Sequence, residues 1–273
     1  MKDNKVKPDK DIFDSLNPNA EIFEKIKMQK PIWWTLFIQD KDLYIDLRKD
    51  NYINVYYYGG SLAKIEYRNG FIASIHEKYK GFDGNGYTKL DLDSLKKKDI
   101  EDIKERIKIY YLNKGNSEKP AEKKIQGKMI LENPNYIDSE FQYNPGEKKL
   151  RIDLIELFDG KLSFVELKGI TDNRLRNDEI RNKDIPEIIE QMKKYREFIC
   201  EYQTEIINYY KKLIQLKNDL GLSKHNPNFI LEKEPKLLIV NTYKKSTKRR
   251  EERINAIENL LNKHKVEYYI VKL

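Results

Sequence analysis

Two charged residues interrupt an otherwise apolar run, LSFVELKGI, at residues 162–170. The carboxylate of Glu166 and the ammonium of Lys168 are two positions apart. Because side chains alternate along a β-strand, both would point to the same face. A run of this kind is typical of a strand buried on both faces, where an isolated charge is costly. The pair is therefore a candidate for chemistry.

An Asp-Gly turn brings a second carboxylate to Glu166. Residues 159–160 separate two apolar runs, which predicts a two-residue β-hairpin. A hairpin closed there pairs Phe158 with Lys161, and the continued register sets Asp153 opposite Glu166. Two carboxylates about 5 Å apart in a buried sheet repel each other and require a positive partner. A divalent cation fits, because Mg²⁺ binds one or two carboxylates together with water and phosphate oxygens.

A structural ion pair is the alternative to a metal site. In the same register Arg151 lies opposite Lys168 and would join such a network. The Glu-x-Lys spacing alone carries little information, since it recurs at Glu122/Lys124, Glu147/Lys149 and Glu234/Lys236. We prefer the metal interpretation, because buried ion pairs are costly to desolvate and contribute little stability.

The elements around this hairpin indicate an α/β protein with two parts, residues 1–114 and 115–273. Short β-rich runs separated by turn residues predict an antiparallel meander in the first part, after a short helix near NAEIFEKIKMQ and before a helix at residues 94–112. Its predicted strands are IWWTLFI, LYIDLR, YINVYYY, SLAKIEY and GFIASI. We expect Trp33 and Trp34 to lie in the core.

The second part is predicted to run helix, three strands, helix, strand. A helix at residues 119–131 precedes the strands YIDSEFQYN, KKLRIDLIELF and KLSFVELKGI. Residues 184–187 resemble a capping box and open a long helix that extends toward Gly221. The strand KLLIVNTY, a basic helix and the strand VEYYIVKL follow.

These residues resemble the motifs of a known family. Asp153, followed on the next strand by Glu166-Leu167-Lys168, resembles the PD-(D/E)XK nuclease superfamily. Gln191-x-x-x-Tyr195 resembles a motif of its RecB-like and lambda-exonuclease-like branch. The resemblance covers about residues 118–243, and it departs from the family where Ile152 replaces a proline before the Asp.

The resemblance implies a restriction-endonuclease-like core and roles for individual residues. Asp153, Glu166 and the backbone carbonyl of Leu167 would hold Mg²⁺ or Mn²⁺, and Lys168 would act beside the metal as a catalytic residue. Gln191 and Tyr195, four positions apart on a helix, would position the substrate strand. Helix-flank packing is the alternative for that pair. Glu122 would be a further metal ligand, or otherwise a solvated helix residue.

The charge of the chain permits a nucleic-acid partner. Lysines and arginines outnumber acidic residues, 53 to 45, for a formal net charge of +8. Arg174, Arg176 and Arg181 follow the charged strand, and the run KKSTKRREER contains Lys248, Arg249 and Arg250. These arginines and lysines could contact phosphates, although the second group also reads as an exposed helix start. No apolar run reaches the roughly 20 residues that a membrane span needs, and the start does not resemble a signal peptide, so we expect a cytoplasmic protein without membrane contact.

The sequence therefore favours a metal-dependent nuclease that hydrolyses phosphodiester bonds, with DNA favoured over RNA. The resemblance associates such an enzyme with bacterial defence or DNA repair. Two alternatives stay open: an inactive nucleic-acid-binding or assembly protein on the same fold, and a structural α/β domain with an internal ion-pair network. Endonuclease or exonuclease action, the role of residues 1–114 and assembly into homo-oligomers are not decided by these residues.

Overall fold

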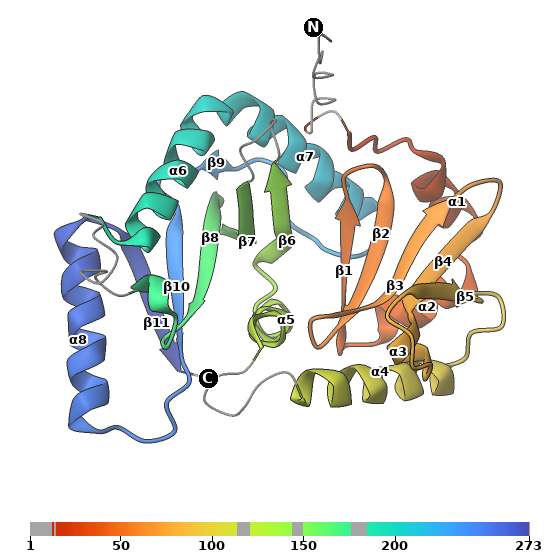
Figure 1. Ribbon diagram of the computed structural model, residues 1–273. Helices are drawn as coiled ribbons and strands as arrows, with labels where there is room; N and C mark the ends of the chain where they lie inside the picture. Colours follow the sequence, from red (N-terminus) through yellow and green to blue (C-terminus); the bar gives the residue numbers. More distant parts are fainter. Residues whose placement is uncertain (1–12, 14, 114–120, 144–149, 176–184, 273) are drawn as a thin grey trace, which may run out of the picture.

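Five consecutive strands form an antiparallel sheet in the first half of the chain (Figure 1). The protein is represented by a computed structural model, which describes residues 13, 15–113, 121–143, 150–175 and 185–272. Neighbours in sequence are neighbours in the sheet throughout, in the order β1-β2-β3-β4-β5, so the antiparallel meander is confirmed, although its last strand, β5, was not predicted. Its strands are β1 (Leu43–Arg48), β2 (Tyr52–Tyr57), β3 (Gly60–Tyr67), β4 (Phe71–His76) and β5 (Tyr87–Leu90).

Four helices accompany this sheet. The apolar side chains of α1, α2 and α4 join the buried core of the sheet, while α3 is a single turn between β4 and β5. The helices are α1 (Glu21–Gln29), α2 (Ile32–Gln39), α3 (Glu77–Lys80) and α4 (Lys97–Leu112).

The prediction of a strand at IWWTLFI is wrong, because this run forms α2. A short run that is apolar on every side has no period that separates a buried helix from a buried strand. Pro31 is the N-cap residue of α2, a place where its missing N–H costs nothing. Trp33 and Trp34 are buried, so their predicted place in the core is confirmed.

The second half forms a mixed sheet in the order β11-β10-β8-β7-β6, with β9 also paired to β8. The neighbours β6, β7 and β8 are antiparallel, whereas β10 is parallel to both β8 and β11. The strands are β6 (Tyr136–Tyr143), β7 (Leu150–Phe158), β8 (Lys161–Gly169), β9 (Ile230–Leu231), β10 (Lys236–Asn241) and β11 (Glu267–Lys272).

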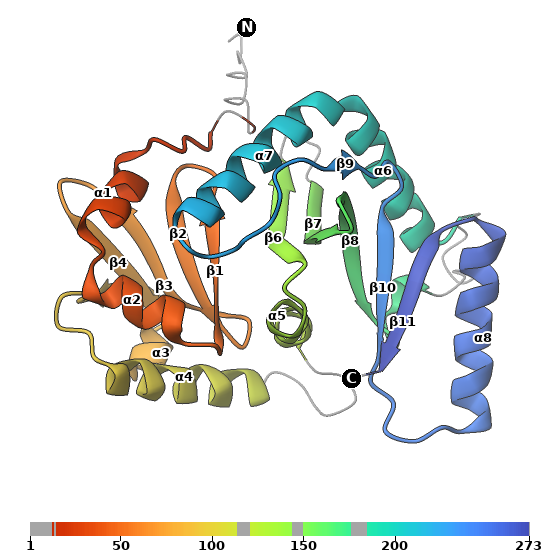
Figure 2. The same ribbon diagram turned by 180° about the vertical axis from the view of Figure 1, so that it is seen from behind.

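Helices cover both faces of this sheet. One face packs on α6 and α7, while the other packs on α5 through Ile125, which contacts a cluster that includes Leu154 and Val165 (Figures 1 and 2). Among the described residues no helix is both long and apolar enough to span a bilayer. The helices are α5 (Glu122–Glu132), the 3₁₀ turn η1 (Asn173–Leu175), α6 (Glu187–Glu201), α7 (Gln203–Asp219) and α8 (Lys248–Lys263).

The single long helix expected before Gly221 is two helices, α6 and α7, which meet at Tyr202. Neither Gly nor Pro marks this break. The ring centroid of Tyr202 lies 5.0 Å from that of Tyr143 and 5.3 Å from that of Phe198. The chain therefore changes direction at a residue that packs in an aromatic cluster. Of the predicted capping box, Asp184 lies outside the described residues, and Pro186 is the N-cap residue without a side-chain cap.

The two sheets meet along a seam between β1 and β6, with α5 at one end (Figure 1). Gly59, in the β2–β3 turn, and Gly127, in α5, allow the backbones to approach closely. A Cβ atom on Gly127 would lie 2.8 Å from the backbone nitrogen of Gly59. One continuous set of buried apolar side chains extends across both halves of the described chain.

Candidate metal and catalytic site

The β7–β8 hairpin has the predicted turn and register. Asp159 and Gly160 both have positive φ, 49° and 69°, as a type I′ turn requires. Phe158 pairs with Lys161, and the pairing continues to Leu154 and Val165. Asp153 and Glu166 are the next positions along the two strands, so the hairpin brings the two carboxylates together as predicted.

Lys168 makes contact with three of the four predicted metal ligands, all except Glu122. Its ammonium donates to Glu166 Oε1 and, at 2.9 Å, to the carbonyl of Leu167, and it lies 3.8 Å from Asp153 Oδ2. All three charged side chains are buried, and Lys168 is only 1% exposed. Two carboxylates and one carbonyl therefore converge on a single position, which a positive charge occupies.

Helix α6 holds the second carboxylate from the other side. Gln191 Nε2 donates to Glu166 Oε1 at 2.7 Å. The hydroxyl of Tyr195 lies 2.9 Å from Glu166 Oε2 and 2.5 Å from the Arg151 carbonyl, and it can donate its one proton to either oxygen. Gln191 and Tyr195 are also 2.6 Å apart, Nε2 to Oη. One helical turn separates them, so both face the hairpin as the spacing predicts. Burial and then the charge of Glu166 raise the pKa of Tyr195, which therefore keeps its proton and remains a donor.

Asp153 is fixed by the backbone. Its Oδ2 accepts a hydrogen bond of 2.9 Å from the N–H of Leu167, and its carbonyl accepts one of 2.6 Å from Gln126 Nε2. Its other carboxylate oxygen accepts no hydrogen bond from the residues that the structure describes. Burial, and after it the charge of Glu166, raise the pKa of Asp153 to about 6 despite Lys168. Two carboxylates here share a single ammonium, that of Lys168. We call Asp153, Glu166, Lys168, Gln191 and Tyr195 the hairpin cluster.

Glu122, at the start of α5, lies at the edge of this site. Burial and the charge of Asp153 raise the pKa of Glu122, which places the two carboxylates within electrostatic reach of each other. Arg174 Nη2 is 4.0 Å from Glu122 and 2.7 Å from Asp172 Oδ2. Burial alone would raise the pKa of Asp172, but its hydrogen bonds from Arg174 outweigh this and lower it. The predicted residues Glu122 and Arg174 are therefore neighbours, with Asp172 as a partner that the sequence reasoning missed.

The other predicted contact residues fall into two groups. Arg176 and Arg181 lie outside the described residues. Lys248, Arg249 and Arg250 form the first turn of α8, where Arg250 lies over the ring of Tyr243 at 4.6 Å. Helix α8 reaches the edge of the site through Arg253, the last residue of the basic run KKSTKRREER, which donates to the carbonyls of Ile170, at 2.9 Å, and Asp172, at 3.3 Å.

The donor set fits a hard divalent cation with few protein ligands. Two carboxylates and a backbone carbonyl are oxygen donors of the kind that Mg²⁺ prefers, and Mg²⁺ keeps several water ligands. Among the described residues no three Asp, Glu, His or Cys side chains are arranged to hold a metal ion. Any ion at this position would therefore be held by Asp153, Glu166 and the Leu167 carbonyl, in competition with the Lys168 ammonium.

A second group of buried charges, which the sequence reasoning missed, lies at the seam between the sheets. Arg48 Nη2 is 2.9 Å from Asp46 Oδ2, and its Nη1 is 3.4 Å from Asp138 Oδ1. Lys217 Nζ is 3.3 Å from Asp46 Oδ1, and Ser139 Oγ donates to Asp46 at 2.6 Å. We call Asp46, Arg48, Asp138 and Lys217 the seam cluster.

The two carboxylates of the seam cluster differ in pKa. Burial would raise the pKa of Asp46, but Arg48 and Lys217 hold it below its usual value. Burial and the charge of Asp46 raise the pKa of Asp138 to about 6. Two pockets adjoin this cluster, of about 90 Å³ beside Arg48 and Asp138 and about 480 Å³ beside Asp46 and Lys217.

Comparison of the chain with protein-family models, with curated proteins and with solved structures gives no match in any of the three. What is established is the coarser description: an α/β protein with an antiparallel first sheet and a mixed second sheet flanked by helices.

Proposed function

We propose that this chain is a metal-dependent nuclease of the PD-(D/E)XK kind that hydrolyses phosphodiester bonds, with DNA as the favoured substrate. The observation that carries the proposal is the convergence of Asp153, Glu166 and the Leu167 carbonyl on one cation position, next to Lys168. The order α5, β6, β7, β8, α6 and α7, then β10 also supports it, because helix, three strands, helix, strand is the order that the resemblance implies. Residues 115–273 would then form the nuclease part, and residues 1–114 a part of its own.

The residues of the chain have separate roles in this proposal. A bound Mg²⁺ or Mn²⁺ ion would polarise the phosphodiester and lower the pKa of a water molecule. Gln191 and Tyr195 fix Glu166 so that its carboxylate cannot rotate. Lys168 supplies a compact positive charge that offsets the charge developing on the phosphate. Arg174, which pairs with Asp172 at the edge of the site, would contact a neighbouring phosphate of the same strand.

One observation favours a second candidate, a protein of similar fold without catalysis. The Lys168 ammonium already lies among the three oxygens, as it would in a purely structural ion-pair network. Under this candidate the chain binds nucleic acid through its basic residues, or has a role in assembly, and does not require a metal.

Cleavage assays separate the two candidates. Linear and circular DNA are incubated with the full chain in Mg²⁺ or Mn²⁺, alongside Asp153→Asn and the matched surface control Asp102→Asn, whose side chain is exposed in α4. We expect cleavage by the wild type and by Asp102→Asn, and none by Asp153→Asn. Cleavage of the circle would identify an endonuclease. Absence of cleavage by the wild type with either ion, or unchanged cleavage by folded Asp153→Asn, would reject the nuclease proposal.

A further inference from the structure

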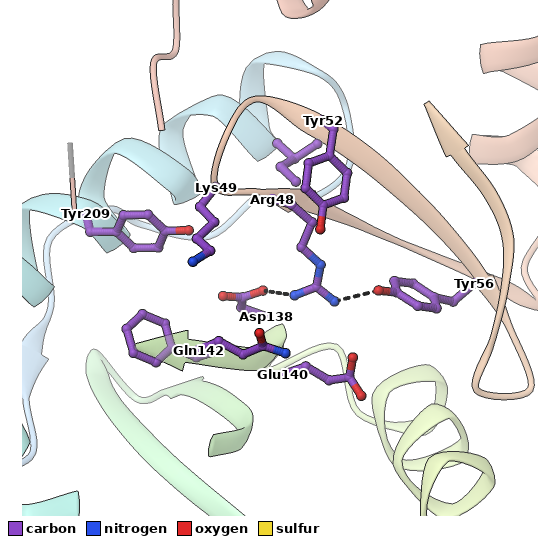
Figure 3. A pocket seen from close by; sticks show the side chains of 10 residues that line it. Arg48, Lys49, Tyr52, Tyr56, Asp138, Glu140, Gln142 and Tyr209 are labelled. Atoms are coloured by element: carbon purple, nitrogen blue, oxygen red, sulfur yellow. Dashed lines mark hydrogen bonds and ion pairs between the residues drawn. The ribbon is translucent and has the colours of Figure 1, made fainter. Parts of the chain in front are cut away.

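A small polar pocket opens at the seam, beside Arg48 and Asp138 (Figure 3). It has a volume of about 90 Å³ and lies between the start of β2, strand β6 and helix α7. The hairpin cluster does not contribute to its walls. The pocket is lined by Leu47, Arg48, Lys49, Tyr52, Tyr56, Asp138, Glu140, Phe141, Gln142 and Tyr209.

The carboxylates of this pocket are already satisfied by the protein. Asp138 Oδ1 accepts from Arg48 and from the N–H of Ser139, at 2.9 Å, and Asp138 Oδ2 accepts from Tyr210 at 3.1 Å. Glu140 pairs with Arg151 and, at 3.3 Å, with Lys123. Both carboxylates of the pocket therefore already have partners, and the described residues leave neither one free to bind a cationic ligand.

The donors of the pocket, in contrast, have capacity left. Tyr209 is only 5% exposed, and its hydroxyl, which donates to none of the residues that the structure describes, is accessible from the pocket. The same holds for the hydroxyl of Tyr52 and the ammonium of Lys49. Figure 3 shows the Tyr209 hydroxyl and the Lys49 ammonium directed into the same space above Asp138. Burial and the nearby charge of Asp138 raise the pKa of Tyr209, so this phenol keeps its proton and can donate.

A group that enters the pocket can therefore accept hydrogen bonds from these donors without displacing a protein partner. The charges agree with an anionic acceptor. Arg48 and Lys217 neutralise the two carboxylates of the seam cluster, and Lys123 and Arg151, outside the pocket, neutralise Glu140. The positive charge of Lys49 is therefore not balanced by a carboxylate of the pocket.

The geometry points to a binding site for a small oxyanion of the phosphate class, held by Tyr52, Tyr209 and Lys49 with Arg48 behind them. Three donors around one small cavity suit a tetrahedral oxyanion, and charged acceptors make the stronger hydrogen bonds. The pocket is too small for a nucleotide. A larger ligand would insert only a terminal phosphate, so free phosphate and a phosphomonoester terminus are the two sources of the same chemistry.

Calorimetric titration of the full chain with inorganic phosphate, without metal and without DNA, tests this site. We expect saturable binding, weakened about tenfold in Tyr209→Phe and in Lys49→Gln, because each loses one hydrogen bond to a charged ligand. Tyr209→Phe keeps the ring that packs 6.3 Å from Phe13 and from Phe141, so the fold is retained. The matched controls Tyr87→Phe and Lys41→Gln, both exposed and outside the pocket, should bind as the wild type does.

Parallel titrations with thymidine 5′-monophosphate and with tetramethylammonium identify the source. Tighter binding of the monoester than of phosphate would indicate a terminal phosphate as the natural ligand, and the reverse would indicate the free ion. No saturable phosphate binding, equal binding by all variants, or preference for tetramethylammonium would overturn the site. If Tyr209→Phe fails to fold, Tyr52→Phe, at a less buried position, makes the same test. None of these outcomes depends on nuclease activity.

Discussion

The hairpin cluster and the seam cluster are built from similar groups but differ in the balance of charge. Each contains a buried aspartate, Asp153 or Asp138, whose pKa burial raises to about 6. In the hairpin cluster two carboxylates share one lysine, whereas in the seam cluster two carboxylates share an arginine and a lysine.

The hairpin cluster thus has one cationic side chain for two carboxylates, whereas the seam cluster has two. Arg48 presents its guanidinium as a rigid fork to two carboxylates and to Tyr56, which fixes the relative position of the two sheets. Lys168 presents a single charge to three oxygens, and under our proposal its flexible chain would move aside when a metal ion binds. We therefore expect changes in the hairpin cluster to alter chemistry and changes in the seam cluster to alter stability.

The largest expected difference lies in cleavage rate. Asp153→Asn removes one of two carboxylates, and we expect the rate to fall on the order of 10³-fold. Asp138→Asn, the matched change at the seam, should leave the rate within about twofold of wild type once both proteins are fully folded. Cleavage assays at saturating Mn²⁺ measure both, and equal losses in the two variants would remove the distinction between the clusters.

Stability should respond in the opposite way. Arg48→Met leaves Asp46 and Asp138 buried without their shared partner, and we expect a loss of about 3 kcal/mol or more in the free energy of unfolding. Denaturant titration monitored by circular dichroism measures this loss. Lys64→Met, at a half-exposed ion pair with Glu66, is the control and should cost under about 1 kcal/mol. A loss at Arg48 no greater than at Lys64 would contradict a structural role for the seam.

Two tyrosine hydroxyls allow a finer comparison. Tyr195→Phe removes the donor to Glu166, and we expect about tenfold weaker Mn²⁺ binding and slower cleavage, as for other groups that orient metal ligands. Tyr210→Phe removes the donor to Asp138 and should cost about 1–2 kcal/mol of stability without affecting Mn²⁺ binding. The comparison fails if Tyr210→Phe weakens Mn²⁺ binding as much as Tyr195→Phe does.

The smallest effect concerns pH. Because the folded protein raises the pKa of Asp138 to about 6, it binds this proton more tightly than the unfolded chain does. The contribution of Asp138 to stability therefore falls as pH rises from about 4 to about 6. Unfolding free energies of wild type and Asp138→Asn, measured at several pH values across this window, should show the wild type losing stability relative to the variant as pH rises. A difference that is constant or grows with pH would contradict the assigned pKa.

Asp153, Glu166 and Lys168 were predictable because local rules determine their positions, whereas Gln191 and Tyr195 were predicted from the resemblance. The Asp-Gly turn at residues 159–160 fixes the register, the register brings Asp153 to Glu166, and helical spacing brings Gln191 to Tyr195. Each of these steps involves a short stretch of chain with a regular period. The α/β class and the first sheet were predictable for the same reason, from turn residues between short strands.

The seam cluster was not predictable because no local pattern connects its members. Asp46 and Lys217 are 171 residues apart in sequence, and Arg48 and Asp138 are 90 apart. The hydrogen bond from Arg253 to the carbonyl of Ile170 likewise joins residues that are 83 positions apart in sequence. Such contacts depend on how the sheets pack. The helix α2 and the break at Tyr202 were mispredicted for a related reason, because packing rather than a local signal decides them.

Binding of Mn²⁺ to Lys168→Met, compared with wild type and Asp153→Asn by calorimetric titration, tests the central claim most directly. If the three oxygens form a metal site that the ammonium partly occupies, Mn²⁺ binds the wild type, binds Lys168→Met several-fold more tightly and does not bind Asp153→Asn. Lys168→Met should also lose DNA cleavage despite its tighter metal binding. Absence of Mn²⁺ binding to both the wild type and folded Lys168→Met would contradict the account and leave a structural ion pair.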